Sequence, residues 1–347
     1  MKYVFLIFLF VLIFQACRDG QTLVFCGEYV IVNDFPIIQT PQSEKLDIEI
    51  MGLNQLYVVD TFLIAFKASG HNDFFEIYST NDFRYLGHYL SKGRGPNEFL
   101  SVQYYDNYYQ KNDDIILWIS DHALQKKAQF NLTQSVKQQK TVCDTIFRFS
   151  CSLSSSYQNI NMNDSIVVIT YHVPGNIKYL VENSRTHQVI SEGEFLKSNL
   201  PQRVDDCILN MLMVKHPERE LIACFPMCFN QINLFSPKLG ECSSISYQQP
   251  VDRFKVANQP DSLLVAYYST FSPTSQNVYA LYVNQQQKKY PYWDLPIEIH
   301  EYDWCGKPVS KICLPNNIVY FAVDEKHQCI YAMNAVEEIF RYKVIEI

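Results

Sequence analysis

The sequence predicts an all-β fold, and three observations support this prediction. Residues 297–344 contain five short apolar segments separated by turn-forming residues: Ile297–Tyr302, Val309–Leu314, Ile318–Val323, Ile330–Met333 and Ile339–Val344. Their apolar residues alternate or run in short blocks, and no helical period fits them. Aromatic residues make up 14% of the chain, which suits the half-buried surfaces of pleated strands. Similar strand pairs recur along the whole chain, which indicates a repeat architecture.

The repeat consists of an apolar strand, a turn and a second strand. It begins near residues 56, 116, 165, 220, 262 and 318. A spacing of about 50 residues is typical of radial or stacked β repeats. We therefore predict a six-bladed β-propeller made of four-stranded antiparallel blades. Two separate β domains or a right-handed β-helix are the alternatives, and a β-helix would need much shorter repeats.

The segment before the first repeat has no blade of its own. Its candidate strands lie near Leu23–Phe25, Tyr29–Val32 and Leu46–Ile50. An unpaired sheet edge invites association with other chains, so native folds cover or pair their edges. We expect part of this segment to pair with the C-terminal blade and close the ring.

The N-terminus has the pattern of an export signal. Lys2 is followed by the uninterrupted apolar run Tyr3–Phe14, and Ala16 precedes Cys17. The run is short for a membrane span and fits a signal peptide. The pattern resembles a bacterial lipoprotein signal, which implies cleavage before Cys17 and acylation of that cysteine. An ordinary cleaved signal with an incidental cysteine is the alternative.

This organisation predicts a signal peptide over residues 1–17 and a single propeller domain over residues 18–347. The expected location is the bacterial cell envelope, where acylated Cys17 would anchor the chain in the lipid bilayer. The periplasmic side is the default, and surface exposure stays open. The formal net charge of −7 is spread along the chain without a long basic run, which argues against nucleic acid as a partner.

Eleven cysteines include ten besides Cys17. They form no Cys-x-x-Cys pair, and a zinc knuckle would need two such pairs. An exported chain can form disulfides. We expect most of these cysteines to be buried small hydrophobic side chains, with one or two bridges left open.

A family resemblance rests on residues 91–99, which read Ser-Lys-Gly-Arg-Gly-Pro-Asn-Glu-Phe. This nonapeptide resembles the Gly-Arg-Gly-Pro-x-Glu-Phe signature of six-bladed, TolB-like β-propeller lipoproteins of the Bacteroides group. The Tyr-Asp-Trp turn at 302–304 and the Gly-Lys-Pro-Val sequence at 306–309 are also similar to theirs. The resemblance implies a fold and an envelope location, and it implies no catalytic activity.

The nonapeptide itself is interpreted as a tight connection between blades. Gly93 and Gly95 would permit positive φ, and Phe99 would fill the next core. Arg94 and Glu98 would pair across the turn or meet a neighbouring blade, and a ligand-binding role for the two is the alternative. A dinucleotide fingerprint and a phosphate loop are excluded, because the third glycine and the Gly-Lys-Ser/Thr sequence are absent.

Binding residues are sought among the aromatic clusters. Tyr104, Tyr105, Tyr108 and Tyr109 flank Asp106 and Asn107, which predicts a polar loop rather than a strand. Tyr267–Tyr268 and Tyr290–Trp293 are further clusters. Such aromatic loops can contact glycans or peptides, so the expected partner is an envelope protein or a glycan.

Catalytic motifs are absent from the sequence. No His-Glu-x-x-His or Gly-x-Ser-x-Gly pattern occurs, so neither a zinc protease nor a serine hydrolase has its signature. The main hypothesis is a non-enzymatic binding or scaffold propeller without a cofactor. The alternative is a lactonase-like hydrolase holding a divalent metal such as calcium in the central channel. Its ligands would be Asp60, Asp121 and Asp324, which end three candidate strands in equivalent places.

Overall fold

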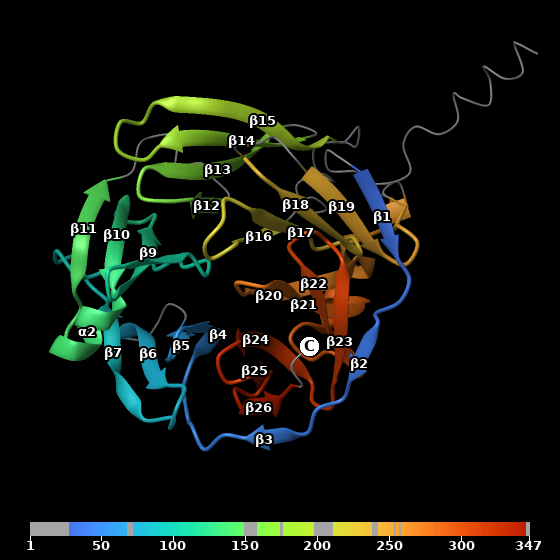
Figure 1. The fold of residues 1–347 in the computed structure, drawn as a ribbon, viewed down its shortest axis with the longest axis horizontal. Helices are drawn as coiled ribbons and strands as arrows, with labels where there is room; N and C mark the ends of the chain where they lie inside the picture. The colour runs from blue at the N-terminus through green and yellow to red at the C-terminus, as the bar shows by residue number, and fades with distance from the viewer. Residues whose placement is uncertain are drawn as a thin grey trace, which may run out of the picture.

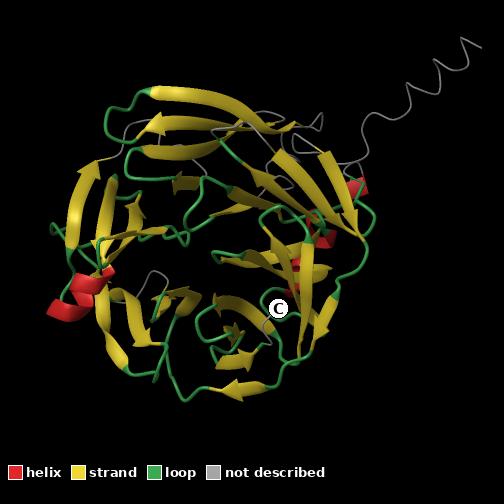
Figure 2. Ribbon diagram, viewed as in Figure 1, coloured by secondary structure: helices red, strands yellow, loops and turns green. Residues whose placement is uncertain are grey.

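The ring of six β-sheets is the dominant feature of the molecule (Figures 1 and 2). The structure is a computed structural model that describes residues 28–67, 72–148, 158–173, 176–197, 211–237, 242–252, 255–256 and 258–344. Each sheet is a blade with four antiparallel strands, and two blades carry one additional parallel strand. The predicted six-bladed propeller is therefore confirmed.

The blades follow one another in chain order, and each is given from its innermost strand outward. Blades one to three are β4 (Leu53–Val59), β5 (Phe62–Lys67), β6 (Asp73–Ser79) and β7 (Tyr85–Ser91); β8 (Tyr108–Lys111), β9 (Asp114–Asp121), β10 (Lys126–Asn131) and β11 (Cys143–Arg148); and β12 (Gln158–Asn161), β13 (Ile166–Val173), β14 (Asn176–Asn183) and β15 (Val189–Lys197). Blades four to six are β16 (Met211–Lys215), β17 (Ile222–Pro226), β18 (Gln231–Phe235) and β19 (Cys242–Tyr247); β20 (Val265–Pro273), β21 (Asn277–Gln286), β22 (Ile297–Asp303) and β23 (Pro308–Leu314); and β24 (Ile318–Asp324), β25 (Cys329–Asn334), β26 (Ile339–Lys343) and β3 (Ser43–Lys45).

Short helices connect strands in the described part of the chain. They include α2 (Leu132–Gln138) between β10 and β11, and the 3₁₀ turns η2 (Asp261–Leu263) before β20 and η3 (Gln287–Lys289) after β21. The α2 helix begins at Asn131, whose side chain accepts a hydrogen bond from the Gln134 backbone N–H. This is an ordinary N-cap. The helix packs outside β9, away from the ring axis.

The N-terminal segment runs along the outside of three blades (Figure 1). β1 (Glu28–Val32) pairs in parallel with β19, and β2 (Ile37–Gln39) pairs in parallel with β23. β3 then pairs antiparallel with β26 and supplies the fourth strand of blade six. The predicted ring closure is confirmed. The predicted strand at Leu46–Ile50 is wrong, because this stretch is irregular and buries Leu46 and Ile50 between blades six and one. The strand predicted at 23–25 lies outside the described residues.

The phase of the predicted repeat is wrong in half of the blades. The predicted starts fall on innermost strands in blades one, five and six, but on second strands (β9, β13 and β17) in blades two to four. The innermost strands of blades two and three, β8 and β12, are only four residues long and rich in polar side chains. The adjacent second strands are more apolar, and so they carry the stronger sequence pattern. Likewise, β22 and β23 belong to blade five and not to a unit with β24–β26.

Hydrophobic clusters hold most neighbouring blades together. Described side chains form shared cores between blades one and two, three and four, four and five, five and six, and six and one. The seam between blades two and three carries polar contacts: Asn107 Nδ2 donates to Asn161 O at 3.0 Å, and Gln129 Nε2 to Asp164 Oδ1 at 3.4 Å. Both faces of most blades are thus buried, which explains the blocky apolar strands of the sequence. Among the described residues, free thiols occur at Cys143, Cys224, Cys305, Cys313 and Cys329.

The nonapeptide at 91–99 connects blades one and two, as predicted. Phe99 is fully buried in their shared core, and Lys126 Nζ lies 4.0 Å from its ring centroid. The predicted positive φ at Gly93 and Gly95 is wrong. The two glycines instead leave room for the Glu98 side chain, which would collide with a Cβ on Gly93.

The predicted pairing of Arg94 with Glu98 is not what the turn shows. Glu98 Oε2 accepts a hydrogen bond from Gly95 N at 2.7 Å, and Lys126 Nζ donates to the Pro96 and Glu98 carbonyls. Arg94 is exposed, and in the described part of the chain no ion pair joins it to Glu98. The contacts of the nonapeptide thus hold the turn together and attach it to blade two.

Candidate functional site

A cavity of about 580 Å³ lies on the ring axis, at the end of the channel where the innermost strands begin. Volumes of this order accommodate a small-molecule ligand. All six blades contribute to its wall, through Asn54, Gln55 and Tyr57; Val102–Asp106; Gln158; Leu212–Val214; Ala266, Ser269–Phe271, Tyr290 and Trp293; and Val319 and Tyr320. The wall is mainly aromatic and aliphatic, with a few amide, hydroxyl and carboxyl groups.

Hydrogen bonds between innermost strands fix the shape of this cavity. Gln158 bridges blades three and four, because its Nε2 donates to Met213 O at 2.9 Å and its Oε1 accepts from Met213 N at 3.0 Å. Gln55 Nε2 donates to Thr270 Oγ1 at 3.2 Å and links blade one to blade five. The wall is therefore held by contacts within the protein and does not depend on a ligand to form.

The loop before β8 supplies the aromatic corner of the cavity. Tyr57 Oη donates to the Tyr104 carbonyl at 2.8 Å, and the two rings meet edge to face at 4.6 Å between centroids. Phe75 also packs edge to face against Tyr104, with ring centroids 5.8 Å apart. Edge-to-face geometry is the favoured arrangement of aromatic pairs. The Tyr104 ring is consequently locked between blade one and the loop.

Asp106 is the one carboxyl group in the wall of this cavity, whose described lining contains no Lys, Arg or His. Its side chain is buried, and the Tyr104 hydroxyl contacts Oδ1 at a long 3.4 Å. Burial raises the pKa of Asp106 to about 7. The pKa values of the Tyr57, Tyr104 and Tyr108 hydroxyls are also raised. Burial is the main cause, and the negative charge of nearby Asp106 is the second. The Asp106 carboxyl is therefore removed from water, and the cavity wall replaces its lost hydration with only one long hydrogen bond among the described residues.

Three polar atoms in the cavity wall are buried and lack a hydrogen-bond partner among the described residues. They are Gln55 Oε1, Ser269 Oγ and Trp293 Nε1. Leaving such groups unpaired costs about 1–3 kcal/mol each, so most buried polar atoms in proteins have a partner. The residues that carry these atoms line the cavity, so a bound molecule that reached the atoms would find an acceptor, a hydroxyl and an N–H donor without partners.

The rim of the cavity exposes further aromatic surface. Tyr290 is 50% exposed and Tyr292 is 64% exposed. Tyr290 and Tyr320 share a hydrogen bond of 2.5 Å between their hydroxyls, which joins the 290–296 loop to β24. Trp293 packs on Tyr290 with centroids 5.8 Å apart. Two residues of the predicted aromatic cluster at 290–293, Tyr290 and Trp293, therefore belong to the same site.

The structure divides the tyrosines predicted as binding residues between the two ends of the channel. Tyr104 and Tyr105 line the axial cavity, whereas Tyr108 and Tyr109 line a second cavity of about 420 Å³ at the opposite end. Residues 104–107 form a loop as predicted, but Tyr108 and Tyr109 lie in strand β8, so the prediction is wrong for these two residues. Asp106 and Asn107 are buried. Sequence reasoning missed Gln55, Ser269 and Asp106, since a polar residue in a strand or turn has no pattern that signals a cavity.

The three carboxylates proposed as metal ligands do not converge. Asp60 and Asp324 end innermost strands, whereas Asp121 ends the second strand of blade two, so the predicted equivalence is wrong. Asp121 accepts backbone hydrogen bonds from Leu100, Ser101 and Leu124 at 2.6, 3.2 and 3.0 Å.

The other two carboxylates also have local partners. Asp324 accepts from the His327 backbone N–H and contacts the His327 ring, and exposed Asp60 pairs with Lys326 at 3.4 Å. Across the described residues, no three His, Cys, Asp or Glu side chains gather as a metal site would require. These carboxylates hold turns.

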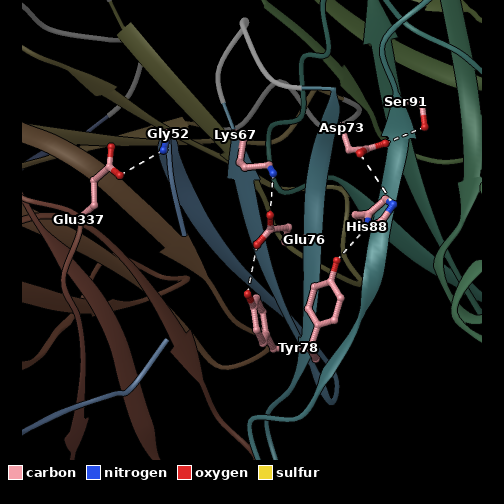
Figure 3. Close-up of polar contacts among 9 residues, drawn as sticks. Gly52, Lys67, Asp73, Glu76, Tyr78, His88, Ser91 and Glu337 are labelled. Carbon is pink, nitrogen blue, oxygen red and sulfur yellow. Dashed lines mark hydrogen bonds and ion pairs between the residues drawn. The ribbon is translucent and has the colours of Figure 1, made fainter. Parts of the chain in front are cut away.

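A cluster of charged side chains lies on blade one, and it has a structural role. Figure 3 shows Lys67 Nζ paired with Glu76 Oε1 at 2.6 Å, while Tyr78 Oη donates to Glu76 Oε2 at 3.1 Å. Lys67 and Glu76 are diagonal neighbours on β5 and β6, and such cross-strand pairs support a sheet. The partners are all within one blade, so this cluster stabilises the blade.

Fold and cavity together define a closed propeller with a ligand-sized site on its axis. The family model described as TolB-like 6-blade propeller-like matches residues 54–326. The chain belongs to this family.

Two solved structures from Bacteroides share the fold. A putative exported protein from Bacteroides fragilis NCTC 9343 is 11% identical with a TM-score of 0.54, over 92% of this chain and 99% of that one. A member of the DUF4221 family from Bacteroides vulgatus ATCC 8482 is 9% identical with a TM-score of 0.54, over 89% and 100% of the two chains. The sequence matches no curated protein.

None of the helices in the described ranges is long and apolar enough to cross a membrane.

Replacing Asp121 should destabilise the fold far more than replacing Asp60. Asp121→Asn exchanges a carboxylate that accepts three backbone hydrogen bonds for an amide whose NH₂ group cannot accept, at a cost of about 2 kcal/mol. Asp60→Asn removes an exposed ion pair and should change stability by less than about 0.5 kcal/mol. Urea unfolding measures both values. Equal effects would contradict the structural role of Asp121.

Asp106→Asn should stabilise the protein at pH 8 and leave its stability almost unchanged at pH 4. The folded-state pKa of Asp106, about 7, lies above its unfolded value. As far as this side chain is concerned, the folded protein is therefore most stable below about pH 4, where Asp106 is protonated in both states. It loses stability as the pH rises towards about 7, because the buried side chain must then carry a charge. Asparagine carries no charge to desolvate, and the gain at pH 8 is at most about 4 kcal/mol. Urea unfolding of both proteins at the two pH values tests this. A gain of the same size at both would show that the carboxylate is not desolvated.

Proposed function

We propose that this protein is an envelope-anchored lipoprotein whose propeller binds a ligand in the axial cavity without transforming it chemically. The observation that carries the proposal is the cavity wall, where buried Gln55 Oε1, Ser269 Oγ and Trp293 Nε1 lack partners among the described residues. A bound molecule would satisfy these atoms and cover the surrounding aromatic surface. The cavity wall is built from all six blades, so the whole ring would serve the site.

Binding fits the chemistry of the cavity better than catalysis does. General acid–base or nucleophilic catalysis needs a reactive group held by a second polar group. In the described cavity wall, Asp106 is the only carboxylic acid, and its side chain contacts the Tyr104 hydroxyl. The metal-dependent hydrolase remains the second candidate function, but Asp60, Asp121 and Asp324 are engaged in separate turns. The identity of the ligand is not specified by this proposal. An envelope protein or a glycan is the proposed partner.

The proposed location rests on the N-terminal sequence. The apolar run Tyr3–Phe14 and the Ala16–Cys17 pair have the pattern of a lipoprotein signal; these residues lie outside the described part of the chain. The fold likeness to a putative exported Bacteroides protein is consistent with a location outside the cytoplasm. Anchoring at Cys17 would hold the ring close to the bilayer, on the periplasmic side by default.

Replacing Ser269 with phenylalanine should block the cavity. The Ser269 side chain lines the cavity and has no hydrogen-bond partner in the described structure, so Ser269→Phe fills the space without breaking a bond. The uncharged fluorescent probe N-phenyl-1-naphthylamine should bind the wild-type protein and lose at least about tenfold in affinity to the variant. Fluorescence titration measures both affinities.

The matched control is Ser262→Phe, which adds the same ring at an exposed serine of η2 outside the cavity. It should bind the probe as the wild type does. Equal binding by Ser269→Phe and wild type, with both proteins folded by circular dichroism, would contradict the cavity as a binding site.

Replacing Cys17 with serine should release the protein from the membrane. Acylation requires the Cys17 thiol, and the lipid chains provide the anchor. In a bacterial host, the wild-type protein should incorporate radioactive palmitate and sediment with membranes, whereas Cys17→Ser should do neither. A wild-type protein that is soluble and unlabelled after export would indicate an ordinary cleaved signal.

A further inference from the structure

We infer that the ligand of the axial cavity is an organic cation with an ammonium group, held by the aromatic wall and the Asp106 carboxylate. This inference rests on the proposed function and specifies the chemistry of its ligand. Three features carry it: the charge of the wall, its aromatic rings and the state of its amide groups.

The first feature is the charge complement of the cavity. Its described lining contains one carboxyl group, Asp106, and no Lys, Arg or His. Asp106 is 7% exposed, and among the described residues its side chain contacts the Tyr104 hydroxyl at 3.4 Å. Desolvating a carboxylate without a counter-ion is costly. A ligand cation would supply the counter-ion that the protein does not.

The second feature is the set of aromatic rings that line the same cavity as this carboxyl. Tyr57, Tyr104, Tyr105 and Tyr320 line the cavity, and Tyr290 and Trp293 close it from the loop of blade five. The faces of tyrosine and tryptophan rings attract cations, and several rings around an ammonium group form the usual recognition site for such ligands. Tyr57 and Tyr104 are held in place by their mutual contact, so these rings are ordered before a ligand arrives.

The third feature distinguishes a cation from a polyhydroxylated sugar. A sugar needs many hydrogen-bond donors and acceptors, but three of the five amide side chains that line the cavity already use polar atoms within the protein. Both ends of Gln158 bond to Met213, and Gln55 Nε2 bonds to Thr270. Gln287 Nε2 faces the sulfur atoms of Met227 and Cys228. The few remaining polar atoms suit a ligand with one or two polar groups and an otherwise apolar surface.

The groups that face Asp106 determine the pH dependence of cation binding. They are the hydroxyls of Tyr57 on β4, of Tyr104 in the same loop and of Tyr108 on β8, all of which stay neutral between pH 6 and pH 8 because their pKa values are raised. Asp106 has a pKa of about 7 and is the titrating group. Lowering the pH from 8 to 6 protonates it and removes the negative charge. Affinity for a cation should therefore fall about tenfold over this interval.

Choline and its uncharged isostere 3,3-dimethyl-1-butanol provide the direct test. They have the same shape and hydroxyl group and differ in the charge of one central atom. Isothermal titration at pH 8 should show choline binding about tenfold more tightly to wild type than the isostere does. Asp106→Asn should reduce this preference, remove its pH dependence and change the affinity for the isostere much less than the affinity for choline. Asparagine tolerates the positive φ of 50° at this position, so the variant should fold.

Other results would overturn the inference in distinguishable ways. If the wild-type protein binds the two compounds with equal affinity, or does not bind choline, the inference that the ligand is a cation is refuted. If Ser269→Phe still abolishes binding of the uncharged fluorescent probe, the cavity remains a binding site for another class of ligand. A choline preference of unchanged size in Asp106→Asn refutes the role of the carboxylate. If Ser269→Phe affects no probe, both the inference and the proposed function fail.

Discussion

Closure of the ring is the constraint on which the rest of the structure depends. Blade six obtains only three strands from the C-terminal part of the chain, and β3 supplies the fourth through pairing with β26. Arg341 on β26 reinforces this pairing by contacting Glu44 Oε2 through both Nε and Nη2, at 3.1 and 2.5 Å. Without this strand, blade six would present an open edge, which is a site for association with other chains.

The closed ring converts local strand sequences into an axial site. Residues as distant along the chain as Gln55 and Thr270 come within hydrogen-bonding distance only because blades one, six and five are held in sequence around the axis. The cavity therefore exists before a ligand binds, and binding needs little reorganisation of the wall. The same rigidity keeps Asp106 away from water beside tyrosine rings, and this lowers the stability of the folded protein when the carboxyl is charged. Such locally unfavourable groups are typical of functional sites.

The sequence allowed the fold to be predicted because strand patterns are local. The apolar segments of residues 297–344 and the repeat of about 50 residues survive in the structure as strands and blades. The phase of the repeat was harder to assign, because the short polar strands β8 and β12 give a weak signal beside their apolar neighbours. Tyr104 and Tyr105 were found as aromatic residues in a loop. Ser269 was not, because its role arises only when strands from six blades surround one axis.

The measurement that tests the central claim most directly is a crystal structure of residues 18–347 with N-phenyl-1-naphthylamine. The account predicts ordered density for the probe on the ring axis, in contact with Tyr104, Ser269 and Trp293, and innermost strands in the positions described above. Density for the probe on an outer blade surface, or side chains that fill the axial cavity, would contradict a preformed ligand site at the centre of the ring.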